Sequence, residues 1–156
     1  MDNYNEIITN LFLGNINAAN DENFIKKYKI KYIINLSNEK INIFPNIKYK
    51  HINIDDDPSE NIYKYFDKCT SIIDECLSNN KSILINCKLG LSRSASIIVA
   101  YFIKIKNLSV SESHDVVNNK RSININFGFL EQLNQYALYN KKKNLNLSFK
   151  QYFINK

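Results

Sequence analysis

The combination of side chains best suited to chemistry is a cysteine followed six residues later by an arginine. Cys87 closely follows the apolar run 83–85, and Arg93 precedes a second apolar stretch, so a loop between a buried strand and a helix is expected here. The backbone N–H groups of such a loop and the positive end of the helix dipole together attract an anion. Gly90 gives the loop the conformational freedom to wrap around it. The pattern predicts a phosphate-binding loop.

The side chains of this loop predict how a bound phosphate would react. Arg93 offers a planar fork of donors to two phosphate oxygens. The positive surroundings favour the thiolate of Cys87, which can attack phosphorus and form a phosphocysteine. Ser94 is placed to hydrogen-bond the sulfur and help it leave when water hydrolyses that intermediate. The remaining loop residues are expected to line the phosphate: Lys88, Leu89, Gly90, Leu91 and Ser92.

Two of these residues also have a simpler interpretation. Cys87 could be a small buried hydrophobe, as most cysteines are, but a loop this rich in polar side chains is poor packing material, which favours catalysis. Lys88 is either a solvated loop lysine or a guide for a second negative charge on the substrate.

Cleavage of a phosphate ester also needs a proton donor for the leaving oxygen. Three aspartates, Asp55 to Asp57, stand before Pro58, between a predicted strand and a predicted long helix. Adjacent carboxylates disfavour one another's charged form, which favours keeping one of them protonated for general acid catalysis. The alternative is an ordinary acidic helix N-terminus, stabilised by the helix dipole. Spacing alone leaves both open.

Periodicity predicts alternating strands and helices around these groups. Ser109 and Glu112 have the spacing of a capping box, which marks the start of one helix. The sum is a small α/β domain. The expected strands are 7–8, 11–13, 32–36, 48–54 and 83–85, and the expected helices are 20–27, a long helix from 58, 95–106, one from 109 and 127–139.

Composition limits the class of protein and its surroundings. The 156 residues carry a formal net charge of +6, which suits an anionic partner or simply keeps the protein soluble. The three cysteines are an odd number without a CxxC pair, so neither a disulfide framework nor a metal site is expected, and Cys69 and Cys76 are assigned to the core. Neither a signal peptide nor a membrane span is recognisable. The expected location is the cytoplasm or the nucleus.

Residues 87–94 resemble the signature loop of the cysteine-based protein tyrosine phosphatases, and specifically of the dual-specificity phosphatases. The resemblance extends through 11–14, 33–36 and 121–136, and so covers nearly the whole chain. It implies a three-layer single domain over residues 1–140, with a central mostly parallel sheet flanked by helices. It also implies that no metal or organic cofactor takes part.

The resemblance further assigns the proton donor and exposes one departure from the family. In this family the general acid lies ten residues before an aromatic of the following helix. Counting back from Phe66 selects Asp56, with Asp55 and Asp57 as the next choices. The family usually has histidine before the nucleophile, whereas this chain has Asn86. The amide can support the loop through hydrogen bonds but carries no charge, so we expect an enzyme that is weakened or needs a higher pH.

These implications favour a protein phosphatase acting on phosphotyrosine and on phosphoserine or phosphothreonine, because the short chain leaves no room to deepen a pocket for phosphotyrosine alone. One alternative is a catalytically weak module that binds phosphopeptides. Another is a phosphatase for a phosphoinositide or an RNA 5′-phosphate. Binding to nucleic acid as such is not expected, since no basic helix or aromatic platform is evident.

The last segment, 141–156, follows three consecutive lysines and alternates apolar with polar residues in part. We interpret it as a C-terminal extension that either packs back on the domain or binds a partner. No pattern in the sequence predicts an oligomeric state.

Overall fold

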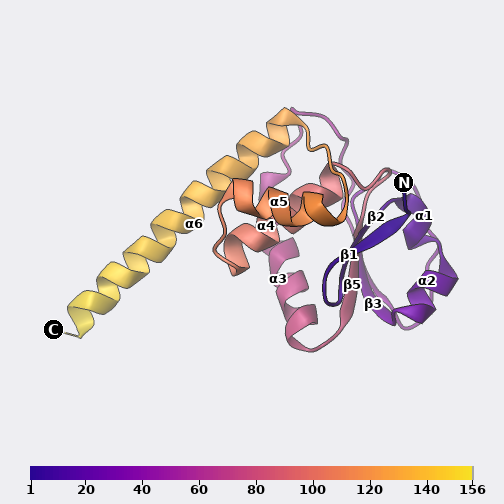
Figure 1. Cartoon of the computed structure of the whole chain (residues 1–156), viewed down its shortest axis with the longest axis horizontal. Helices are drawn as coiled ribbons and strands as arrows, with labels where there is room; N and C mark the ends of the chain where they lie inside the picture. The colour runs from indigo at the N-terminus through magenta and orange to yellow at the C-terminus, as the bar shows by residue number, and fades with distance from the viewer. Residues whose placement is uncertain (156) are drawn as a thin grey trace.

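The computed structural model describes residues 1–155 and is built around a five-stranded sheet (Figure 1). The strand order is β1-β2-β5-β3-β4. β1 runs antiparallel to β2, and all other neighbouring strands are parallel, which confirms the mostly parallel sheet. The strands are β1 (Tyr4–Ile8), β2 (Leu11–Gly14), β3 (Ile30–Asn35), β4 (Lys48–His51) and β5 (Ser82–Asn86).

Helices cover both faces of this sheet and give the expected three layers. Two short helices pack on one face with the smaller apolar cluster, and the longer helices pack on the other with the larger cluster. The short helices are α1 (Ile16–Ala19) and α2 (Glu22–Lys27). The others are the 3₁₀ turn η1 (Tyr63–Tyr65), α3 (Phe66–Ser78), α4 (Arg93–Ile105), α5 (Val110–Lys120) and α6 (Phe127–Ile154).

The central strand β5 shows why the sheet is buried on both sides. Its side chains alternate between the two faces, so Ile83 and Ile85 enter the larger cluster while Leu84 enters the smaller one. All five of its residues are buried. A strand covered on both faces has a continuous apolar run, which is the pattern seen in the sequence.

Side-chain caps mark where several of the helices begin, α2 and α5 among them. The Asp21 carboxylate accepts from the backbone N–H of Phe24 at 3.1 Å at the start of α2. Ser109 and Glu112 form the predicted capping box at the start of α5, in which each side chain accepts from the other residue's backbone N–H. Such caps satisfy helix-end N–H groups that lack an intrahelical partner.

The segment after β4 differs from the prediction. The strand expected over 48–54 ends at His51, and the helix expected from Pro58 begins only at η1, so residues 52–62 form a loop. The reason is local: the Asp57 carboxylate accepts from the backbone N–H of Ser59 at 2.8 Å and from its hydroxyl at 2.6 Å, a turn that competes with helix formation. The three aspartates therefore do not cap a helix.

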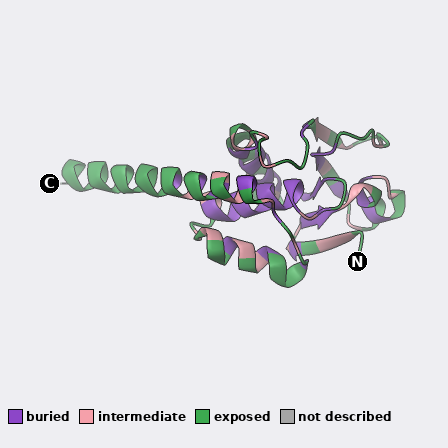
Figure 2. Ribbon diagram, turned by 90° about the horizontal axis from the view of Figure 1, so that it is seen from above, coloured by how far each residue is buried: buried purple, intermediate pink, exposed green. Residues whose placement is uncertain are grey.

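The C-terminal extension forms an exposed continuation of the last helix and does not pack back on the domain. The helix predicted over 127–139 continues as α6 to Ile154, and residues 141–155 are exposed instead of packed back on the domain (Figure 2). No glycine or proline interrupts the sequence after Gly128, so the helix has no signal at which to stop. Asn144 Nδ2 donates to Asn107 Oδ1 at 3.0 Å beside the α4–α5 connection.

None of the helices within residues 1–155 has the length and apolar character that crossing a bilayer requires.

Candidate active site

Cys87 lies directly after β5, at the carboxyl end of the strand in the middle of the sheet. Its side chain is only 2% exposed. The Sγ atom lies 3.1 Å from the Ser94 hydroxyl, and the backbone N–H of Gly90 donates to it at 3.3 Å. The sulfur thus sits inside the curl of the loop, with two groups able to stabilise a thiolate.

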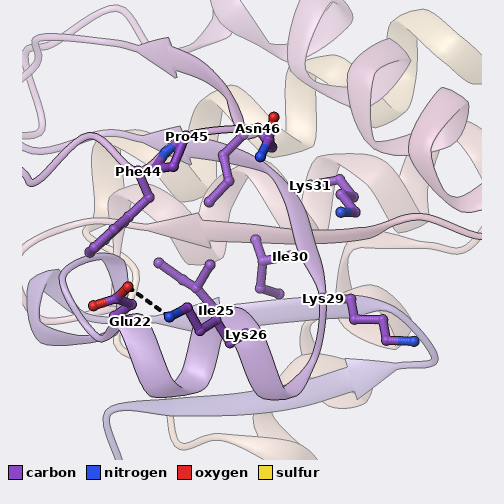
Figure 3. Close-up of a pocket in the computed structure, with 10 residues that line it drawn as sticks. Glu22, Ile25, Lys26, Lys29, Ile30, Lys31, Phe44, Pro45 and Asn46 are labelled. Carbon is purple, nitrogen blue, oxygen red and sulfur yellow. Dashed lines mark ion pairs between the residues drawn. The ribbon is translucent and has the colours of Figure 1, made fainter.

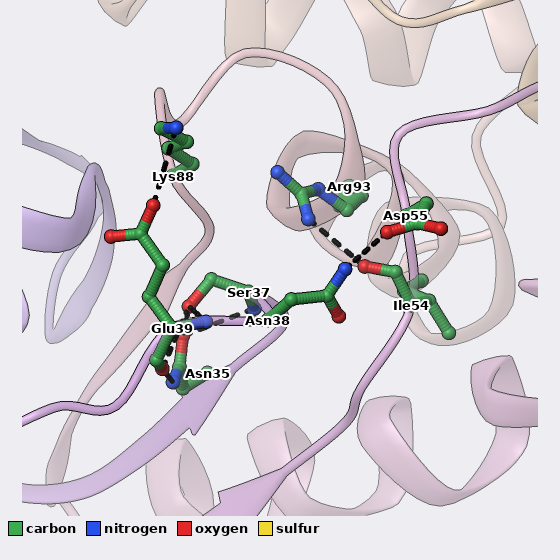
Figure 4. A network of polar contacts seen from close by, with 8 residues as sticks. All are labelled: Asn35, Ser37, Asn38, Glu39, Ile54, Asp55, Lys88 and Arg93. Carbon is green, nitrogen blue, oxygen red and sulfur yellow. Dashed lines mark hydrogen bonds and ion pairs between the residues drawn. The ribbon is translucent and has the colours of Figure 1, made fainter.

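Arg93 begins α4 and reaches across the same loop. The residue is 8% exposed, and one Nη atom of its guanidinium donates to the carbonyl of Ile54 at 2.9 Å (Figure 4). The Nε–H is buried and has no partner within the described residues. A buried donor left unpaired is costly unless a ligand completes it. An anion bound over Cys87 would do so.

The start of α4 also leaves hydrogen-bond donors available at this site. The Ser92 side chain makes no capping bond to the helix; its hydroxyl accepts from the backbone N–H of Asn126 at 3.1 Å. The first N–H groups of α4 are therefore left without this cap and add the positive end of a 13-residue helix to the site.

Gly90 adopts a left-handed backbone conformation where the loop bends around the Cys87 sulfur. Its φ of 70° lies in the left-handed region, and a Cβ added there would collide with the carbonyl of Gly14 on β2. Only glycine meets both requirements without strain. Of the other loop residues, Lys88 and Leu89 are exposed, Leu91 is half-buried and Ser92 is buried.

Arg121 is the functional residue that the sequence reasoning missed. It follows α5 and donates to the carbonyls of Gly90 and Leu89 at 2.9 and 3.1 Å, and to the carbonyl of Asp2 and the Asn5 side chain at 2.7 and 2.9 Å. It thereby ties the signature loop to the N-terminal segment. No local pattern marks this role, because the loop carbonyls lie 31 and 32 residues away in the sequence.

The charge of Arg121 also reaches the nucleophile. Burial lowers the pKa of its guanidinium, while negative charge on Cys87 and on Asp2 raises it.

Asn86, the departure from the family pattern, is fully buried at the end of β5. Its Nδ2 donates to Asn35 Oδ1 at 3.0 Å, and that oxygen also accepts from the N–H and hydroxyl of Ser37 at 3.1 and 2.8 Å. Asn35 Nδ2 lies 3.2 Å from His51 Nδ1. The residue before the nucleophile is thus anchored by neutral groups from β3 and its following turn, with a histidine at the far end of the network.

The three aspartates have three different partners. Asp56 Oδ1 accepts from Asn126 Nδ2 at 2.8 Å, and Asp55 accepts from Asn38 Nδ2 (Figure 4). Asp57 accepts from Ser59, and this hydrogen bonding lowers the pKa of Asp57 below its ordinary value. A carboxyl held in its charged form is a poor proton donor, which argues against Asp57.

The aspartate loop rests against the start of α6. The main chain of Pro58 approaches Gly128 so closely that a Cβ there would overlap it. Gln132 accepts from the N–H of Tyr63 and donates to the carbonyl of Glu60, both at 2.9 Å. The Arg93–Ile54 bond fastens the other end of this loop to the phosphate site.

Other candidate groups lie apart from this site. Burial raises the pKa of the Cys69 thiol to about 12 and also raises that of Cys76, and both side chains are buried in the core, as expected. Within residues 1–155, no group of three metal-ligating side chains comes together. A pocket between α2 and the segment 44–47 (Figure 3) is lined by apolar and lysine side chains together with Glu22 and Asn46, and it contains none of the site residues.

Comparison with known proteins agrees with this geometry. The family described as "dual specificity phosphatase, catalytic domain" matches residues 11–138. A probable rhodanese domain-containing dual specificity protein phosphatase of Dictyostelium discoideum is 35% identical over 128 residues, 81% of this chain and 27% of that protein. Human dual specificity protein phosphatase 6 is 37% identical over 132 residues, 82% of this chain and 35% of that protein.

A solved structure agrees as well. That of human tyrosine phosphatase-like serine/threonine/tyrosine-interacting protein matches with a TM-score of 0.82 at 31% identity, covering 87% of this chain and 97% of that one. The chain spans about a quarter to a third of the length of the two phosphatases named above. It belongs to the dual specificity phosphatase family, and its fold is that of the protein tyrosine phosphatases.

Proposed function

We propose that this chain is a phosphoric monoester hydrolase that removes phosphate from protein side chains through a phosphocysteine intermediate. The observation that carries the proposal is the buried Cys87 sulfur, held by Ser94 and Gly90 beside an Arg93 whose Nε–H lacks a partner within the described residues. Membership in a family named for dual specificity supports substrates with phosphotyrosine and with phosphoserine or phosphothreonine.

The first half of the reaction transfers the phosphoryl group to the enzyme. The Cys87 thiolate attacks phosphorus, and the bond from phosphorus to the substrate oxygen breaks. Asp56 gives its proton to that leaving oxygen. Arg93 and the N–H groups of the loop stabilise the charge on the phosphoryl oxygens in the transition state.

The second half restores the enzyme. Water attacks phosphorus, Asp56 takes a proton from it, and the sulfur–phosphorus bond breaks with its electron pair returning to sulfur. The Ser94 hydroxyl, 3.1 Å from Sγ, can donate to the departing thiolate. Inorganic phosphate and free enzyme result.

Hydrolysis of an aryl phosphate and of matched phosphotyrosine, phosphoserine and phosphothreonine peptides tests the proposal. We expect turnover that vanadate inhibits and that Cys87→Ser abolishes. Asn86→His should shift the activity to lower pH, because an imidazolium beside the loop favours the thiolate. Peptide binding without any turnover would instead support the phosphopeptide-binding module, which the neutral Asn86 environment favours.

The expected partner is a phosphorylated protein. A cytoplasmic or nuclear site of action remains a prediction, and imaging of the tagged full-length protein would test it.

A further inference from the structure

Lys88, the residue after the nucleophile, forms an ion pair with Glu39. Its Nζ lies 3.2 Å from Oε1 of Glu39, a residue in the turn that follows β3 (Figure 4). Both side chains are substantially exposed, at 61% and 47%. Lys88 is the only lysine between Cys87 and Arg93, so this ion pair engages the one lysine of the phosphate-binding loop.

Buried contacts hold the backbone of Glu39 in place. Ser37 is fully buried, and its hydroxyl accepts from the Glu39 N–H at 3.3 Å. Asn35 Nδ2 donates to the Glu39 carbonyl at 3.4 Å. The same Asn35 accepts from Asn86, so the turn that carries Glu39 is fixed to the end of the strand that carries the nucleophile.

The consequence for substrates is electrostatic. An unpaired lysine beside the phosphate would attract a second anionic group on the substrate. A lysine paired with a carboxylate attracts that second group only weakly, because the ion pair has almost no net charge. A second phosphate would also meet the carboxylate itself, and like charges repel.

We propose that Glu39 is a specificity-determining residue that masks Lys88 and selects substrates with one phosphate over substrates with a second phosphate beside the first. This inference rests on the proposed function and sharpens it. The preferred class is singly phosphorylated peptide; doubly phosphorylated segments and phosphoinositides carrying neighbouring phosphates are disfavoured.

A binding experiment separates this proposal from catalysis. In a Cys87→Ser background, the Kd is measured at low salt for two synthetic peptides of one sequence, one with a single phosphotyrosine and one with an added phosphothreonine two residues away. Glu39→Gln should improve the Kd of the doubly phosphorylated peptide about fivefold relative to the single one, the scale of an exposed charge interaction. Glu39→Lys should improve it further.

Two further variants fix the cause. Adding Lys88→Met to Glu39→Gln should remove the gain, because no cation is then left to unmask. Glu22→Gln is the matched control: it removes a carboxylate from a similar exposed ion pair with Lys26, 2.9 Å long, on α2, which contributes nothing to the site. It should leave the ratio of the two Kd values unchanged.

The outcomes are distinct. If Glu39→Gln and Glu39→Lys leave the Kd ratio at the value of the Cys87→Ser parent, the specificity proposal is wrong. It is equally wrong if the gain persists after Lys88 is replaced. Failure of the proposed function would show itself elsewhere, as absent turnover in the protein with Cys87 intact, and would not alter this binding ratio.

Discussion

The two loops that supply the chemistry are built in opposite ways. In the loop from Cys87 to Arg93, the nucleophile, Ser92 and the arginine are all less than a tenth exposed. In the loop 52–62, Asp55, Asp56 and Asp57 are all exposed. The first loop is held by the Arg121 side chain and by backbone N–H groups of neighbouring segments, those of Ile16, Asn124 and Asn126. Among residues 1–155, the Asp56 side chain accepts one hydrogen bond, from Asn126.

This difference matches what each loop has to do. A nucleophile and an anion cradle work best when they are preorganised, because the protein then does not rearrange as charge develops. A proton donor must serve leaving groups of different shape and then activate water, so an exposed position suits it. Variants that remove the support of the buried loop should therefore lower both stability and turnover, whereas variants of the nucleophile or of the aspartates should lower turnover with little change in stability.

The largest effect is expected from the nucleophile itself. Cys87→Ser should lower kcat on an aryl phosphate by roughly 10⁵-fold or more, the scale on which an enzyme loses activity with its nucleophile. Stopped and continuous assays for released phenol measure it. Because the hydroxyl is smaller and still accepts a hydrogen bond, the Tm should change little. Residual turnover within tenfold of the parent would show that another group attacks phosphorus.

Loss of the proton donor comes next. Asp56→Asn should reduce kcat by about 10²- to 10⁴-fold, the usual contribution of general acid catalysis. The loss should be greater for phosphoserine peptides than for aryl phosphates, because an alkoxide leaves less readily than a phenoxide. Asp57→Asn is the matched control and should retain activity. If the two variants exchanged these results, the assignment of the acid would move to Asp57.

Arg121→Met tests the support behind the buried loop. It leaves the carbonyls of Leu89 and Gly90 without their donors, and each lost buried partner costs about 1–3 kcal/mol. We expect the free energy of unfolding to fall by about 2–4 kcal/mol in urea titration, and kcat/KM by about 10- to 100-fold. Arg121→Lys keeps the charge but not the planar fork, so it should recover only part of both. Full activity in the methionine variant would mean that the loop holds its shape unaided.

The smallest expected effect concerns the one bond that holds Asp56. Asn126 also caps α6 by accepting from the N–H of Phe129 at 2.9 Å, so alanine would disturb the helix as well. Asn126→Ser keeps a capping oxygen and removes the amide Nδ2 that donates to Asp56, because the shorter hydroxyl stays at the cap. It should leave the Tm nearly unchanged and lower kcat by about threefold to tenfold, the range of one hydrogen bond. A fall in Tm without a fall in kcat would contradict this division of roles.

Sequence reasoning succeeded where the cause was local. The run 83–85, the loop through Arg93 and the capping box at Ser109 are each specified within about a dozen residues, and the structure places them as expected. The choice of Asp56 among three equivalent neighbours came from family spacing, since nothing local distinguished it.

The remaining features depend on partners that the sequence does not bring together. Arg121, Asn35 and Glu39 contact the loop or its neighbouring residue Asn86 from other elements. Arg121 lies 31 residues from Gly90 in the sequence, Asn35 lies 51 residues from Asn86, and Glu39 pairs with the similarly distant Lys88. The late start of the helix after Pro58 arose from competition, because the Asp57–Ser59 turn satisfies the same backbone groups that a helix would use.

The long helix α6 has a kinetic consequence. Starting a helix is the unfavourable step, and here it is accomplished inside the domain, around buried Phe129, Leu133 and Tyr136. Each residue beyond Asn140 then only extends a turn that already exists, although so short a stretch would be marginal as a free peptide. Opening should proceed as unzipping from Ile154 inward. Amide hydrogen exchange should slow residue by residue toward Asn140, and warming should shorten this projection of about 20 Å gradually, without a transition of its own.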